Sequence, residues 1–177
     1  MRLQSAREHI ANCFPRSGEI KMPLLAVAAG KAMPDMTIGY ITRKDKAKYI
    51  DVQNLFIDED YSAQFKETAA RFGKYTDYDE RKYYHFKLSP DRKDQADAFR
   101  VQEYAKAYAE KAFPDCECVI ATHTDTKTVH AHIIVNAVHP LTGRKLRFTE
   151  SGYTKLKDMA NPVSYTHLRA HETGRNL

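Results

Sequence analysis

Residues 118–136 constrain the fold of this chain more than any other stretch, because they combine strand patterning with three histidines. Successive side chains of a β-strand point to opposite faces, so the alternation around His130 and His132 places both imidazoles on one face. The apolar residues just before His123 predict a neighbouring strand, and the polar residues 124–128 predict a hairpin loop. We therefore expect His123 at a strand end, within reach of the other two rings.

Three imidazoles on one sheet face form a candidate site for a divalent metal ion. His123, His130 and His132 would leave open positions on the ion for substrate oxygens, as catalytic metal sites require. Asp125 lies in the loop between the two strands, where its carboxylate can accept the second ring N–H of one histidine. A His-X-His pair also occurs by chance on ordinary strands. The third histidine and the nearby carboxylate favour the metal site, but by themselves they name no reaction.

Length and composition fit one globular domain. With 177 residues and 42% hydrophobic content, the chain can bury a core, which argues against disorder. No apolar run is long enough to span a membrane, so we expect a cytoplasmic protein without membrane insertion. The three cysteines have no repeated spacing and predict ordinary reduced thiols. The formal charge of +5 modestly favours an anionic partner such as nucleic acid.

Helical and strand patterns are mixed along the chain, and the late strands are linked by a hairpin. The pattern predicts an α+β fold, with an antiparallel or mixed central sheet and helices packed mainly on one face. In residues 81–89, an apolar set that includes Phe86 alternates with a polar, basic set that includes His85. One helix is expected within residues 1–21, and four more are expected to begin near Pro34, Asp58, Asp94 and Thr149. The expected strands cover residues 23–30, 52–57, 81–89, 119–122, 130–136 and 144–148.

A tyrosine next to a basic strip is the second candidate functional feature. Tyr40 follows Gly39 and precedes Arg43, Lys44 and Lys46. Half-buried packing is the ordinary role of such a tyrosine, so a functional role needs independent support. Cations elsewhere can grip phosphates, although solvated faces are also rich in Lys and Arg. These further cations are Lys87, Arg144, Lys145 and Arg147.

Three motifs, in this order, resemble plasmid relaxases, the mobilization nucleases of the MobA/VirD2 type in the HUH endonuclease class. They are Gly39-Tyr-Ile-Thr42, Tyr84-His-Phe-Lys-Leu-Ser89, and the histidine stretch from Ala121 to Asn136. Residues 142–145 also resemble the turn and basic strand that follow the histidines in that family. The resemblance covers about residues 36–148, and it implies a relaxase nuclease domain over residues 34–160.

The resemblance implies that Tyr40 attacks the scissile phosphate at the nick site of a transfer origin. This attack forms a 5′-phosphotyrosyl link and frees a 3′-hydroxyl, which initiates conjugative mobilization. A phenol, with an ordinary pKa of about 10, is mostly neutral at cell pH. It therefore needs a positive field, which a histidine-held ion supplies. The implied site comprises His123, His130 and His132 as ligands of magnesium or manganese, Asp125 as their orienting partner, and Ser89 as a DNA contact.

The resemblance also implies partners and raises questions about both ends of the chain. The expected partners are single-stranded DNA at the nick site, an accessory relaxosome protein and a coupling protein. Tyr40 lies farther from the start than the family pattern predicts, so we expect residues 1–33 to be an extension or an upstream mis-start, with Tyr49 as the nearest substitute nucleophile. Residues 161–177 resemble translated adaptor sequence, and we expect a non-native tail in place of a longer C-terminal part.

Two other functions stay open on the sequence. One is an HUH replication initiator or transposase, which would use the same tyrosine and metal on another substrate. The other is a non-catalytic nucleic-acid-binding domain whose histidines only pack. Replication initiators generally place the tyrosine after the histidines, whereas Tyr40 precedes them here. The motif order therefore favours a relaxase.

Overall fold

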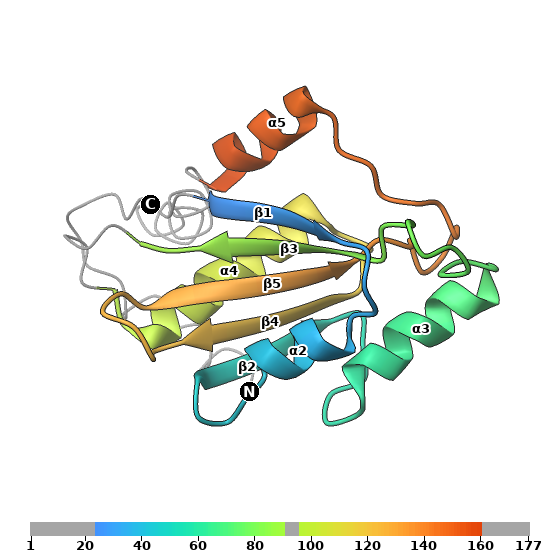
Figure 1. The fold of residues 1–177 in the computed structure, drawn as a ribbon. Helices are drawn as coiled ribbons and strands as arrows, with labels where there is room; N and C mark the ends of the chain where they lie inside the picture. The colour runs from blue at the N-terminus through green and yellow to red at the C-terminus, as the bar shows by residue number, and fades with distance from the viewer. Residues whose placement is uncertain (1–23, 91–95, 161–177) are drawn as a thin grey trace, which may run out of the picture.

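The computed structural model describes residues 24–90 and 96–160 of the chain (Figure 1). Within these ranges the elements follow in the order β1 (Leu24–Gly30), α2 (Asp35–Ile41), β2 (Ala47–Gln53), α3 (Tyr61–Arg71), β3 (Tyr83–Leu88), α4 (Ala98–Ala112), β4 (Cys118–His123), β5 (His130–Asn136) and α5 (Glu150–Ala160). The helix expected within residues 1–21 lies outside the described residues. None of the helices in the described ranges is long and apolar enough to cross a membrane.

The five strands form one sheet in the order β1-β3-β5-β4-β2. Every neighbouring pair is antiparallel, and β5 lies in the middle between β3 and β4. The predicted hairpin between β4 and β5 is confirmed, and it pairs His123 directly with His130. The edge strand β1 lies within residues 1–33, so the sheet begins before the domain boundary expected from the sequence.

The two faces of the sheet differ in what covers them. On one face, α4 and α5 pack against an apolar layer from the strands, which includes Tyr84, Phe86, Leu88, Ile120 and Ile133. On the other face a smaller cluster joins α2 and Phe65 of α3 to the strands. Figure 1 shows α4 behind the sheet and α2 in front of it. The predicted α+β fold is therefore confirmed, and much of the second face stays open for polar groups.

Side-chain caps set where two helices begin. The carboxylate of Asp60 accepts a hydrogen bond from the amide of Ala63 at the start of α3, and Asp97 does the same for Arg100 in α4. Each cap satisfies an amide that has no partner within its helix. The start predicted for α4 is corrected: Asp97 is its N-cap, whereas Asp94 lies outside the described residues.

Two predicted strands have different bounds in the structure. Residues 144–148 make only an isolated bridge, between Val138 and Lys145, because both edges of β5 are already paired with β3 and β4. Strand β2 begins at Ala47 and ends at Gln53, earlier than the predicted 52–57. The next residue, Asn54, has a left-handed backbone with a φ of 55°, which breaks the extended conformation.

The described cysteines and the turn after β5 agree with the prediction. Cys116 and Cys118 are buried free thiols, and burial raises the pKa of Cys116 to about 11. After β5, the amide of His139 donates to the carbonyl of Arg144, which closes the predicted tight turn. Gly143 in this turn has a φ of 65°, a conformation that favours glycine.

Two glycine-to-alanine changes test the packing of α2 and β1. A methyl group at Gly30 would lie 2.0 Å from the ring of Tyr83, whose hydroxyl is held by Thr37 at 2.6 Å. A methyl group at Gly39 would meet no atom within 4 Å. We expect Gly30→Ala to lower the free energy of unfolding by about 1–3 kcal/mol and Gly39→Ala, inside a helix, to raise it by about 0.5–1 kcal/mol. Urea unfolding measures both values, and a Gly30→Ala protein as stable as the wild type would contradict the packing.

Candidate metal and nucleophile site

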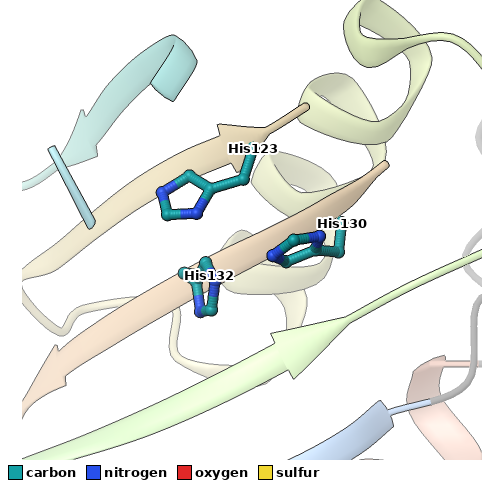
Figure 2. A group of neighbouring side chains, drawn as sticks. All are labelled: His123, His130 and His132. Atoms are coloured by element: carbon teal, nitrogen blue, oxygen red, sulfur yellow. The ribbon is translucent and has the colours of Figure 1, made fainter. Parts of the chain in front are cut away.

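The three histidines of the hairpin meet on the sheet face opposite α4. Figure 2 shows the rings of His123, from β4, and of His130 and His132, from β5, gathered over the two strands. The ring centroids lie 4.5–5.4 Å apart. One ligand atom of each residue lies within 4.8 Å of those of the other two. The side chains are buried, so these polar rings are placed together at the cost of their hydration.

Each of the three rings has one nitrogen engaged by a neighbour. A neutral imidazole that donates from one nitrogen keeps a lone pair on the other. The lone pairs then fall on Nδ1 of His123 and on Nε2 of His130 and His132, so the donor set fits a divalent cation. The engaging partners are the carbonyl of Ile41 for Nε2 of His123 at 2.7 Å, the carbonyl of Thr128 for Nδ1 of His130 at 3.1 Å, and Nε2 of His85 for Nδ1 of His132 at 2.7 Å.

Burial favours the neutral form of His130, His132 and the neighbouring His85. It lowers the pKa of His132 to about 2, with the neighbouring histidines and Lys87 acting in the same direction. Burial also lowers the pKa of His85 to about 4 and that of His130 below its usual value. Because a protonated imidazole has no lone pair to offer, the lowered pKa values keep His130 and His132 able to bind a metal at cell pH.

Tyr40 lies next to the histidines, at the exposed end of α2. Its ring centroid is 6.2 Å from that of His123, and 46% of the residue is exposed. The ammonium of Lys46 donates a hydrogen bond to the phenolic oxygen at 3.1 Å and lies 4.3 Å from the ring centroid. The structure therefore brings the predicted nucleophile and the predicted ligands together, with a cation at the phenol.

Asp125 contacts this cation, which differs from the sequence prediction. Its Oδ2 lies 3.3 Å from Nζ of Lys46, whereas the engaged histidine nitrogens bond to other groups. Burial would raise the pKa of Asp125, but the hydrogen bond and charge of Lys46 outweigh it and lower the pKa. The hydrogen bond to Tyr40, followed by that to Asp125, raises the pKa of Lys46. In place of an orienting partner for a ring, Asp125 is the counter-ion that holds Lys46 at the phenol.

Tyr49, the substitute nucleophile, lies on the other face of the sheet. It pairs in register with Thr122, whose hydroxyl bonds to Gln102 of α4 at 2.7 Å. The ring of Tyr49 packs edge-on against Phe99 of α4, with centroids 6.2 Å apart. The sheet therefore separates Tyr49 from the histidines.

The residues predicted to contact DNA fall into two groups. Lys87 lies directly opposite His132 in register and shares its face, and the buried Ser89 approaches the carbonyl of Val129, next to His130. Near Tyr40, the side chain of Arg43 forms two hydrogen bonds with Asp45, and Lys44 is exposed.

The second group lies beyond the other end of β3. Lys145 is held there by Glu80 at 2.8 Å, while Arg144 and Arg147 are exposed. Together with Lys74 and Arg81, Lys145 and Arg147 line a cavity of about 500 Å³. These cations and the histidines are therefore at different ends of the sheet.

Two side chains at the site had no assigned role in the sequence prediction. The alternation in residues 81–89 puts His85 on the polar face of its strand, and Lys46 belongs to the basic strip after Tyr40. Strand alternation carries the signal for His85, since every second residue shares the face of the histidines. For Lys46 the signal is weaker, because its contact with Tyr40 depends on the turn that joins α2 to β2.

The buried imidazoles make the metal-free protein sensitive to acid. An unfolded histidine has an ordinary pKa of about 6.5, whereas that of His85 in the folded protein is about 4. Between these values the unfolded state binds more protons, so stability is kept above about pH 6.5 and falls as the pH falls below it. We expect wild type to lose stability relative to His85→Leu between about pH 7 and pH 5, by up to about 1.4 kcal/mol per pH unit. Urea unfolding in EDTA measures this difference, and a constant value would contradict it.

Comparison with known proteins places this arrangement in a family. Residues 40–167 match the family described as "Relaxase: MobA/VirD2-like, nuclease domain". Two proteins of Staphylococcus aureus, each called "Protein rlx", are similar: one is 26% identical over 111 residues, covering 62% of this chain and 32% of the relative. The other is 33% identical over 89 residues, covering 50% of this chain and 27% of the relative. The matched region thus spans less than a third of the length of these relatives.

A solved structure supports the same fold. It comes from work on the molecular basis of vancomycin resistance transfer in Staphylococcus aureus, and it has a TM-score of 0.58 to this chain at 9% identity. The alignment covers 89% of this chain and 95% of that one. Because the family match covers most of the sequence, the chain belongs to the MobA/VirD2-like relaxase nuclease domain family.

Proposed function

We propose that this domain makes a site- and strand-specific nick in single-stranded DNA at a transfer origin, in the cytoplasm, and so initiates mobilization of a plasmid or other mobile element. The observation that carries the proposal is the placement of Tyr40 beside the three histidines at one end of one sheet face. An exposed phenol next to a buried set of metal ligands can reach a phosphate bound above them. The family match supports DNA as the substrate.

In the proposed reaction, Oη of Tyr40 attacks the scissile phosphorus and the bond from phosphorus to the 3′-oxygen breaks. The phenol loses its proton, and the released 3′-oxygen gains one to become a hydroxyl. The number of phosphodiester bonds and of protons is unchanged, so the reverse attack can rejoin the strand without ATP. The ammonium of Lys46, 3.1 Å from Oη, favours negative charge on that oxygen as the proton leaves.

His123, His130 and His132 are proposed to hold the divalent ion. When bound, the ion supplies positive charge to the phosphate oxygens and to the charge that develops in the transition state. Magnesium prefers oxygen ligands, whereas the three donors here are nitrogens, so the donor set favours manganese over magnesium. The pairing of Lys46 with Asp125 keeps the cation beside the phenol.

The proposed DNA contacts follow the two groups of cations. Lys87 and Ser89, which flank the histidines, are proposed to contact the strand close to the nick, and Arg43 and Lys44 to contact it on the side of Tyr40. Residues of the distant group would reach a nucleotide farther along, since β3 spans about 17 Å between the two ends. This group comprises Arg144, Lys145 and Arg147. The accessory and coupling proteins expected from the family also remain proposals.

The other two functions receive less support. A replication initiator or transposase would use the same groups, but the order of Tyr40 before the histidines and the family match both favour a relaxase. A purely packing role would not require the three histidines to bring one ligand atom each within 4.8 Å of the others, whereas a metal site does.

Covalent trapping tests the nucleophile. Purified protein incubated with manganese and single-stranded DNA from a cognate transfer origin should form a protein–oligonucleotide adduct, seen as a shifted band on a denaturing gel. We expect Tyr40→Phe to abolish the adduct, because the attacking oxygen is removed, and Tyr49→Phe to form it at the wild-type rate, because Tyr49 lies on the other face. A Tyr40→Phe protein that still forms the adduct would refute the assignment.

Metal removal tests the histidine site. We expect EDTA to stop adduct formation and added manganese to restore it. His130→Ala removes a ligand and should weaken manganese binding by more than the about 10–100-fold that loss of an outer partner costs. His139→Ala, a change in the turn after β5, is the matched control and should bind as the wild type does. Calorimetric titration measures the affinities, and nicking that persists in EDTA would exclude a metal-dependent mechanism.

A further inference from the structure

His85 lies behind one of the proposed ligands. It stands on β3 opposite Ile134 of β5, two residues along the strand from His132, so the two imidazoles are diagonal neighbours on one face. Nε2 of His85 is 2.7 Å from Nδ1 of His132, and the ring centroids are 4.9 Å apart. The residues whose ligand atoms converge are His123, His130 and His132, so His85 stands outside the ligand set and in contact with one member of it.

The chemistry of the contact fixes the direction of its hydrogen bond when a metal binds. A neutral imidazole carries one N–H and one lone pair. If His132 offers the lone pair of Nε2 to an ion, its proton must be on Nδ1, and that N–H then donates to Nε2 of His85. His85 must in turn carry its own proton on Nδ1. The opposite direction, with His85 donating, would place a proton on Nε2 of His132 and block the ligand position.

We propose that His85 is a positioning residue for the metal site: it accepts the Nδ1–H of His132 and so fixes the tautomer and orientation of that ligand. This inference rests on the histidine metal site of the proposed function. The carbonyls of Ile41 and Thr128 do the same for His123 and His130. His85 differs from these two carbonyls in being a side chain, so substitution can remove it.

A neutral acceptor also determines the charge of the site. Orienting partners of metal-bound histidines are often carboxylates, which make the imidazole a stronger ligand. His85 is neutral, and the carboxylate of Asp125, in the loop between β4 and β5, is paired with Lys46. A divalent ion held by these histidines would therefore face a DNA phosphate without a carboxylate on His132 to offset its charge. Compared with a carboxylate acceptor, a neutral acceptor gives weaker metal binding and leaves more positive charge to attract the anionic substrate.

Manganese titration of the whole chain tests the inference. The proteins compared are wild type, His85→Leu, which removes the acceptor, and His85→Gln, whose amide oxygen can replace it. We expect His85→Leu to weaken manganese binding by about 10–100-fold and His85→Gln to recover most of that loss. His139→Leu removes an imidazole from the turn after β5 and should leave the affinity unchanged. Recovery by glutamine separates hydrogen bonding from simple packing.

Nitrogen NMR of the histidine rings gives a second readout that does not require activity or a folded variant. In wild type loaded with zinc, a diamagnetic probe, we expect His132 to carry a slowly exchanging Nδ1–H and His85 to have an unprotonated Nε2. A proton on Nε2 of His85 would overturn the inference even if His85→Leu failed to fold. Equal manganese affinity in wild type and in folded His85→Leu would overturn it as well.

The outcomes separate this inference from the proposed function. If wild type binds neither manganese nor zinc, the metal site itself is wrong and the role of His85 fails with it. If wild type binds manganese and forms the DNA adduct while His85→Leu binds equally well, the proposed function stands and only the positioning role is lost.

Discussion

The pairing of β4 with β5 is the interaction on which the site depends. It sets His123 directly opposite His130 and places His132 two residues farther along the same face. Because side chains alternate along a strand, a slip of one residue in this register would turn one strand's histidines to the other face. The register is fixed by the opposite side of the same strands, where Ile120 and Ile133 are partners in the layer beneath α4. The apolar packing on one face of the sheet therefore fixes the positions of the three histidines on the other face.

The helix that carries the phenol is fixed to the same strands. His123 bonds to the carbonyl of Ile41, the last residue of α2, where helix carbonyls have no partner within the helix. The next residue after β4, Thr124, donates its amide to the carbonyl of Lys46 in the turn that follows α2. One nitrogen of His123 therefore anchors the end of the helix that carries Tyr40, while the other is available as a proposed metal ligand. The separation of Tyr40 from the proposed metal site is thus set by the fold.

Much of this arrangement was predictable from local patterns. Alternation alone placed His130 and His132 on one face, and an apolar run followed by a polar loop predicted the hairpin that brings His123 to them. Contacts between distant segments were not predictable in the same way. The bonds of the ring nitrogens to Ile41 and His85 depend on which strands are neighbours, and pattern alone does not give strand order. Residues 144–148 show the same limit, since their pattern is that of a strand but β5 has no free edge to pair with them.

The distribution of charge around the site follows from these contacts and suits an anionic substrate. The three rings are buried, and burial lowers the pKa of His130 and His132. A neutral imidazole would add nothing to the charge of an ion held at the proposed site. The ammonium of Lys46 lies at the phenol of Tyr40 and is balanced by Asp125. The positive charge beside the proposed nucleophile is therefore held in place without adding to the net charge of the site. Under the proposed function, a phosphate bound between the three histidines and Tyr40 would meet a divalent ion on one side and the attacking phenol on the other. A carboxylate in place of His85 would weaken the attraction between the ion and the phosphate, because its negative charge would cancel part of the ion's charge close to where the phosphate binds.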